Sequence, residues 1–198
     1  SAIHAQVVSY IFTEANICSD YLKLSDNERS QLLLSNFTQD ILSKVKLDDA
    51  LAHEIIATIK AVAKIQQHNG TNSIERYIIS NTDSIASVLE VLWLVNLVNQ
   101  NNPQSAIILE VVPLFETIDD LANSEQIMAT LFETPLYLQN VKHWNMCQTI
   151  MLGFSDGTKD GGYLMANWSI FQAKKRLSKL AKKYGVNLVF FDGRGGPP

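Results

Sequence analysis

The chain has 198 residues, of which 46% are hydrophobic, and a formal net charge of −4 at pH 7. This length supports one good hydrophobic core, and the mild acidity argues against a general nucleic-acid-binding protein, which would carry a basic stripe. Cys18 and Cys147 lie far apart in the sequence and fit no metal-ligand spacing. We therefore expect no disulfide framework, which agrees with a reducing, cytoplasmic location.

Residues 1–70 predict an N-terminal helical segment. Ser25 followed by Glu28 has the spacing of a capping box at the start of a helix. Apolar residues recur at three-and-four spacing through residues 48–70, and this pattern stops at the helix-ending pair Asn69 and Gly70.

The longest apolar stretch, "SIASVLEVLWLVNLV", covers residues 84–98. It is interrupted by Glu90 and Asn96, and it is shorter than the ~20 apolar residues that a membrane-spanning helix needs. We expect a buried helix here, and neither a membrane nor a nucleic acid as a partner. The lysine-rich pattern of residues 174–183 is interpreted as the solvated face of another helix.

Residues 71–198 alternate between short apolar runs and helical patterns. Four runs are rich in Ile, Val, Leu and Phe without strict alternation, as in strands that are buried on both faces: "RYIISN", "AIILEVVPLFET", "TIMLGFSD" and "NLVFFDGRGG". Helical patterns separate them at residues 84–99, 119–133 and 163–184. This order predicts βαβ units and a parallel sheet.

The predicted fold class is α/β, a helix-rich partial (β/α)8 TIM-type barrel with about four parallel strands plus N-terminal helices. The strand centres lie 33 to 40 residues apart, which suits barrel units with loop insertions, and a doubly wound open sheet is the alternative. Four units would form half a barrel, and the sequence stops at "GRGGPP", where a crossover helix should begin. We expect a fragment of a larger enzyme; an intact chain with a short disordered tail is the alternative.

Polar residues follow the predicted strands, at the edge where parallel α/β folds bind ligands. Glu116 and Asp156 are carboxylates on successive strand ends, and such oxygens are suitable ligands for Mg²⁺ or Mn²⁺. Lys159 and Arg194 would offer positive charge to a phosphate or carboxylate. Simpler explanations stay open: Asp156 could cap a helix that starts near Gly162, Glu116 could pair with a lysine, and the two cations could be exposed.

Three stretches resemble segments of the phosphoenolpyruvate carboxylase family, in the same order and with the same spacing. They are "RYIISNTDSIASVLEVLWL", "VVPLFETIDDL" and the stretch from "IMLGFSDGTKDGG" to "FFDGRGG". The resemblance covers essentially the whole chain. It implies a TIM-type barrel embedded in many extra helices, in an enzyme several times longer than this chain.

The resemblance also implies a reaction and a site. Phosphoenolpyruvate and bicarbonate would give oxaloacetate and phosphate with Mg²⁺ or Mn²⁺, in a cytoplasmic parent enzyme that is expected to be a homotetramer. By matching positions, Glu116 and Asp156 resemble the metal ligands, and Lys159 and Arg194 resemble anion-binding residues. Asp192 stands where the family usually has His, so we count it among the catalytic residues but expect an altered proton-handling role.

The isolated chain is expected to be inactive as a carboxylase, because it lacks half of the barrel and several of the family's anion-binding residues. Two other functions stay open. The parent could be a metal-dependent barrel enzyme that acts on another enolate or phosphate substrate, or the chain could be a non-catalytic assembly domain.

Overall fold

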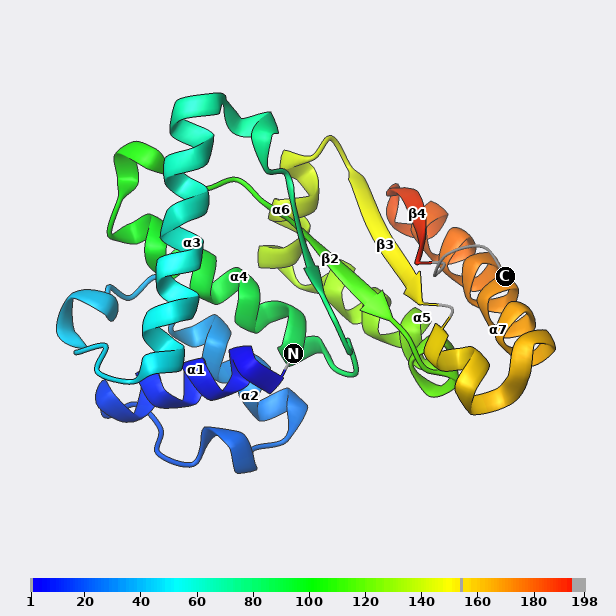
Figure 1. Ribbon diagram of the computed structural model, residues 1–198, viewed down its shortest axis with the longest axis horizontal. Helices are drawn as coiled ribbons and strands as arrows, with labels where there is room; N and C mark the ends of the chain where they lie inside the picture. The colour runs from blue at the N-terminus through cyan, green and yellow to red at the C-terminus, as the bar shows by residue number, and fades with distance from the viewer. Residues whose placement is uncertain (1, 154, 194–198) are drawn as a thin grey trace. The chain divides into compact units, whose positions relative to one another are not determined.

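The computed structural model describes residues 2–153 and 155–193 (Figure 1). Contacts divide these residues into two compact units. The first unit contains the described residues up to 76 together with 86–109, and the second contains 77–85 and the described residues from 110 onward. The predicted segments 1–70 and 71–198 divide the sequence by its pattern and stay a prediction.

The first unit is helical. Ser25 precedes the helix α2 (Asp26–Ser35), and its hydroxyl accepts the backbone N–H of Glu28 while the Glu28 carboxylate accepts the backbone N–H of Ser25 at 2.8 Å. This confirms the predicted capping box. Helix α3 (Ala50–Asn69) ends at Gly70 with a φ of 88°, a value that glycine adopts without strain, as the Asn-Gly pair predicted.

The core of the first unit forms around the helices α1 (Ala2–Glu14) and α4 (Ile85–Gln100). Phe12 of α1 packs edge-to-face against Trp93 of α4, with ring centroids 5.0 Å apart. Most residues of α4 are buried, which confirms the predicted buried helix. Within the described part of the chain, no helix is both long and apolar enough to cross a bilayer.

The second unit is built on one parallel sheet. Its strands are β1 (Arg76–Ile79), β2 (Glu110–Phe115), β3 (Cys147–Gly153) and β4 (Asn187–Gly193), and they lie in chain order. This confirms the predicted α/β class with four parallel strands. In a (β/α) barrel, neighbouring strands follow one another in chain order, as they do here. In a doubly wound open sheet, the order of the strands reverses at a switch point.

Three helices belong to the second unit: α5 (Ile118–Glu133), α6 (Pro135–His143) and α7 (Ser155–Tyr184). Helix α5 contacts β2 and α7, while α7 also contacts β3 and β4 (Figure 1). The sequence pattern did not predict α6. It predicted that α7 begins at residue 163, eight residues after its observed start. Gly162, with a φ of 79°, interrupts α7 at the point where the pattern begins.

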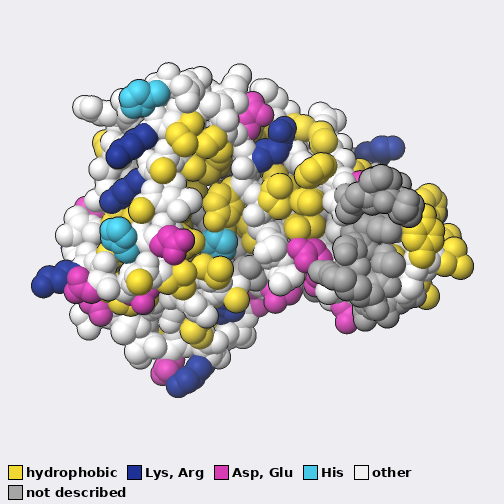
Figure 2. Space-filling view, viewed as in Figure 1, with side chains coloured by type: hydrophobic (Ala, Val, Ile, Leu, Met, Phe, Trp, Pro, Cys, Tyr) yellow, Lys and Arg dark blue, Asp and Glu magenta, His cyan; other side chains and the backbone are white. Residues whose placement is uncertain are grey.

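The prediction that all strands are buried on both faces is wrong for β1, where Ile78 is 43% exposed, and for β4. Val189 and Phe191 are 47% and 50% exposed, because one face of β4 is left uncovered by the described part of the chain. Helix α7 is also apolar on two sides. Ala166, Ala173 and Leu177 are buried, whereas Leu164, Trp168 and Phe171 are exposed. Figure 2 shows hydrophobic side chains gathered at the right of the view, where α7 lies.

Candidate active site at the strand ends

The end of β2 is fixed by the start of the helix that follows it. Thr117 is the N-cap of α5, and its hydroxyl accepts the backbone N–H of Asp120 at 3.0 Å. The Asp120 carboxylate in turn accepts the backbone N–H groups of Thr117 at 3.0 Å and of Glu116 at 3.3 Å. This capping box therefore holds the backbone of the half-buried Glu116 in place.

The end of β3 lies directly against Glu116. The pairing of β2 with β3 places Leu114 opposite Met151 and Phe115 opposite Leu152. A Cβ atom on Gly153 would lie 3.0 Å from the Cα and 3.1 Å from the Cγ of Glu116, closer than such contacts normally are. The absence of a side chain at Gly153 therefore allows Glu116 to lie against this strand end.

The end of β4 completes the same edge. Gly193 is paired with Gly153, and a Cβ atom on Gly193 would lie 2.8 Å from the Met151 Cε. Glu116, Gly153 and Gly193 thus form a continuous rim at the carboxyl ends of three neighbouring strands. Arg194 follows this rim immediately but lies outside the described residues.

The two faces of the sheet carry different residues of the site. One row across the strands holds Leu114, Met151 and Phe191, and the next row holds Phe115, Leu152 and Asp192. Since successive strand residues point to opposite faces, Glu116 shares the face of the first row and Asp192 lies on the other face. On that face the Asp192 carboxylate forms an ion pair with Lys174 of α7.

Asp156 and Lys159 lie at the beginning of α7, directly after β3. The backbone therefore brings both residues to the rim, but their side chains lie outside the described part of the structure. Among the described side chains, there is no group of three or more His, Cys, Asp or Glu residues that could hold a metal ion. The predicted pair of metal ligands, Glu116 and Asp156, stays a prediction, as do the roles of Lys159, Arg194 and Asp192.

Sequence reasoning missed a buried polar cluster in the first unit. The fully buried Glu90 accepts hydrogen bonds from the Tyr21 hydroxyl at 3.0 Å and from Arg29 Nη2 at 2.5 Å. Burial raises the pKa of Glu90 to about 7, although the positive charge of Arg29 opposes this rise. The one signal in the sequence is a charged residue within the apolar run of α4. The cluster joins segments far apart in the sequence, so we interpret it as a structural element.

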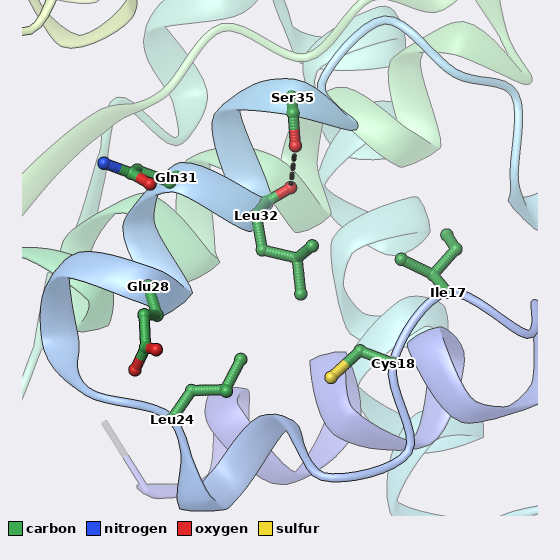
Figure 3. A pocket seen from close by; sticks show the side chains of 7 residues that line it. All are labelled: Ile17, Cys18, Leu24, Glu28, Gln31, Leu32 and Ser35. Carbon is green, nitrogen blue, oxygen red and sulfur yellow. Dashed lines mark hydrogen bonds between the residues drawn. The ribbon is translucent and has the colours of Figure 1, made fainter.

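A surface hollow of about 460 Å³ also belongs to the first unit (Figure 3). Side chains of Ile17, Cys18, Leu24 and Leu32 extend towards it from the loop after α1 and from α2. Its one carboxylate, Glu28, is already used in the capping box. The hollow offers apolar surface and no group of charged side chains, so the rim is the stronger candidate for chemistry.

Comparison with known proteins identifies the family to which the chain with this rim belongs. The model of one protein family, phosphoenolpyruvate carboxylase, matches residues 1–197. The chain belongs to the phosphoenolpyruvate carboxylase family. Among curated relatives, phosphoenolpyruvate carboxylase of Mycobacterium leprae (strain TN) is 37% identical over 202 residues, and that of Mycobacterium avium (strain 104) is 34% identical over 202 residues.

Each of these alignments covers 99% of this chain and 22% of the relative. The chain thus spans about a fifth of the length of the phosphoenolpyruvate carboxylases that it matches. The match confirms the family resemblance seen in the sequence. It also covers both compact units, so the helical first unit and the sheet with its rim belong to the same family segment.

Proposed function

We propose that this chain is a segment of a longer phosphoenolpyruvate carboxylase and that it carries part of the metal and anion site. The whole enzyme would convert phosphoenolpyruvate and bicarbonate into oxaloacetate and phosphate. The observation that carries this proposal is the family match over residues 1–197 combined with the contact of three strand ends at Glu116, Gly153 and Gly193. In parallel α/β folds, that edge is where active sites form.

The residues at the rim suit a divalent metal. Glu116 supplies a carboxylate on a backbone that Asp120 holds in place, and Asp156 begins the adjoining helix. Carboxylate oxygens are the ligands that Mg²⁺ and Mn²⁺ prefer. A divalent ion held there would offset negative charge that develops on the enolate and phosphoryl oxygens.

The cationic residues would serve the anionic substrates. We assign to Lys159 a point charge for a phosphate, and to Arg194 a planar fork that can bind phosphate or bicarbonate through two hydrogen bonds. A bicarbonate oxygen would attack phosphorus, which breaks the bond to the enol oxygen and gives carboxyphosphate and the enolate of pyruvate. Carboxyphosphate would release carbon dioxide and phosphate, and the enolate carbon would then attack carbon dioxide. Asp192 lies two residues before Arg194, and we include it in this site.

Several parts of the proposal concern the whole enzyme. The isolated chain would be inactive, because the remaining substrate-binding groups would come from the rest of the longer protein. The whole enzyme is proposed to be a cytoplasmic homotetramer, and the two free cysteines agree with a reducing location. A related enzyme with another enolate or phosphate substrate is the second candidate, and the carboxylate at Asp192 in place of an imidazole favours it.

The test is oxaloacetate formation by the full-length enzyme from phosphoenolpyruvate and bicarbonate, with and without Mg²⁺. Glu116→Gln and Asp156→Asn should each lower turnover about 100-fold or more, as the loss of an electrostatic group at the reacting centre commonly does. Asp119→Asn removes an exposed carboxylate three residues from Glu116 and serves as the matched control. Unchanged kinetics in both site variants would exclude the metal assignment, and a metal-dependent product other than oxaloacetate would favour the second candidate.

A further inference from the structure

The chain that leaves β1 binds back onto β2 through one buried threonine. Strand β1 ends at Ile79, and Thr82, three residues later, is 0% exposed. The backbone N–H of Thr82 donates to the Leu114 carbonyl at 3.1 Å, and the Thr82 hydroxyl accepts the Leu114 N–H at 3.1 Å. The same hydroxyl donates its hydrogen to the Ile79 carbonyl at 3.1 Å. Thr82 therefore binds both backbone groups of Leu114 and also the strand from which it comes.

The turn that places Thr82 contains a residue in the left-handed region. Asn81 has a φ of 50°, and its carbonyl accepts the N–H of Asp83 at 3.1 Å. Asparagine enters this region more readily than most residues, but at a cost in free energy. Such a conformation persists where the surrounding contacts determine it, and residues of this kind gather at functional sites. The hydrogen bonds of Thr82 supply contacts of this kind.

Leu114 is the residue through which Thr82 reaches the rim. It lies opposite Met151 of β3 and two residues before Glu116, on the same face of β2. Because β2 lies between β1 and β3, Thr82 binds one edge of β2 and Met151 pairs with the other. The end of β2 is thus held at both edges directly before Glu116, which itself lies against Gly153.

We propose that Thr82 is a positioning residue for the Glu116 carboxylate. The proposal rests on the proposed function, in which Glu116 binds the divalent metal, and Thr82 acts through the Leu114 backbone. Loss of its hydroxyl would leave the Leu114 N–H without this acceptor, so the strand end would shift to find another. Metal sites hold their ligand distances to within about 0.2 Å, so a small shift two residues from Glu116 matters.

The test measures Mn²⁺ affinity of the full-length enzyme without substrates, by the electron paramagnetic resonance of the free ion. Thr82→Val removes the hydroxyl but keeps the shape of the side chain, so it should weaken Mn²⁺ binding about tenfold. Thr82→Ala also removes the hydroxyl and should show a similar loss. Thr82→Ser keeps the hydroxyl and should stay within about twofold of the unsubstituted enzyme.

Thr149→Val is the matched control, because it removes another buried threonine hydroxyl from the same sheet. Thr149 is 4% exposed and its hydroxyl donates to the buried Glu110 at 3.1 Å. It precedes Gly153 by four residues, roughly 13 Å along β3. Thr149→Val should lower the urea midpoint as Thr82→Val does, but should leave Mn²⁺ affinity unchanged. An equal loss of affinity in both variants would mean a general loosening of the sheet and would overturn the proposal, as would normal affinity in Thr82→Val.

A second measurement does not depend on the metal. Amide hydrogen exchange of a peptide that covers residues 110–117 should become about fivefold faster in Thr82→Val, and should stay unchanged in Thr82→Ser. If the unsubstituted enzyme binds no Mn²⁺, the metal assignment in the proposed function fails, while the exchange rates still decide whether Thr82 fixes the end of β2. Equal exchange in Thr82→Val and the unsubstituted enzyme would refute the positioning role.

Discussion

Replacing Glu90 by Gln should make the first unit more stable at alkaline pH. Glu90 is fully buried in α4, and its carboxyl oxygen Oε1 accepts hydrogen bonds from Tyr21 and Arg29. Glutamine has nearly the same shape as the protonated acid, and its carbonyl can accept the same two hydrogen bonds. It differs in never carrying the negative charge that burial disfavours.

The magnitude follows from the pKa of Glu90, which burial raises from an ordinary value near 4.5 to about 7. Below pH 4.5 the Glu90 carboxyl is protonated in both the folded and the unfolded chain, so the fold has lost none of the stability that depends on this proton. Between pH 4.5 and 7 the folded chain keeps a proton that the unfolded chain has lost, so stability falls as pH rises. One pH unit corresponds to about 1.4 kcal/mol, so the whole loss is roughly 3 kcal/mol, most of it between pH 5 and 8.

The assay is urea unfolding at pH 5 and at pH 8, followed by the fluorescence of Trp93, which is buried in the same unit. Trp144 and Trp168 are replaced by Phe so that one reporter remains. From pH 5 to pH 8, the stability of Glu90→Gln relative to the parent should increase by roughly 2 to 3 kcal/mol. Glu54→Gln, an exposed carboxyl on α3, should show no such change. The reasoning is refuted if Glu90→Gln is less stable than the parent by the same amount at both pH values, because the carboxylate would then be ionised throughout.

Three further predictions concern the rim and the ends of helices. Gly153→Ala places a methyl group about 3 Å from Glu116, so Mn²⁺ affinity and turnover of the full-length enzyme should fall about tenfold; unchanged affinity would show that Glu116 can move without consequence. Thr117→Ala removes the α5 cap and should cost about 1 kcal/mol in denaturant unfolding, whereas Thr117→Ser should keep most of it. Gly185 has a φ of 68° after α7, so Gly185→Ala should destabilise by about 1 kcal/mol and Gly185→Asn by less; equal stability of both would contradict a left-handed helix end.

The elements with a strong local pattern could be predicted from the sequence. The four apolar runs predicted the four strands, because they are rich in residues that favour strands, although β1 and β4 are only partly buried. The capping box at Ser25 and the helix end at Gly70 could be predicted because each depends on residues that are close in the sequence. Helix α6 was missed because its nine residues are too few for a clear period. The predicted start of α7 is eight residues late because Gly157, Gly161 and Gly162 are poor helix formers and weaken the helical pattern there.

The candidate site could be predicted only as a set of strand-end residues. The sequence suggested that Glu116 and Asp156 end adjacent strands, but not that Gly153 lies against Glu116. The partner of Asp192 was also missed, because Lys174 is 18 residues away on another element. Likewise, the cluster around Glu90 joins residues 61 and 69 positions apart. Such contacts are set by tertiary packing. They leave no repeating pattern in the sequence from which they could be predicted.

The contact between Gly153 and Glu116 limits how this protein can evolve. Every missense change of a glycine codon adds at least a Cβ atom, and at this position that atom would displace the neighbouring strand end. A side chain at Gly153 is therefore tolerated only if the Glu116 backbone gives way by a few tenths of an ångström. A change in the α5 cap, which holds that backbone, would make such a shift easier. Selection for folded variants from a library that randomises Gly153 alone should favour glycine. A library that also randomises Glu116 and Asp120 would show which other residues at these three positions allow the rim to fold.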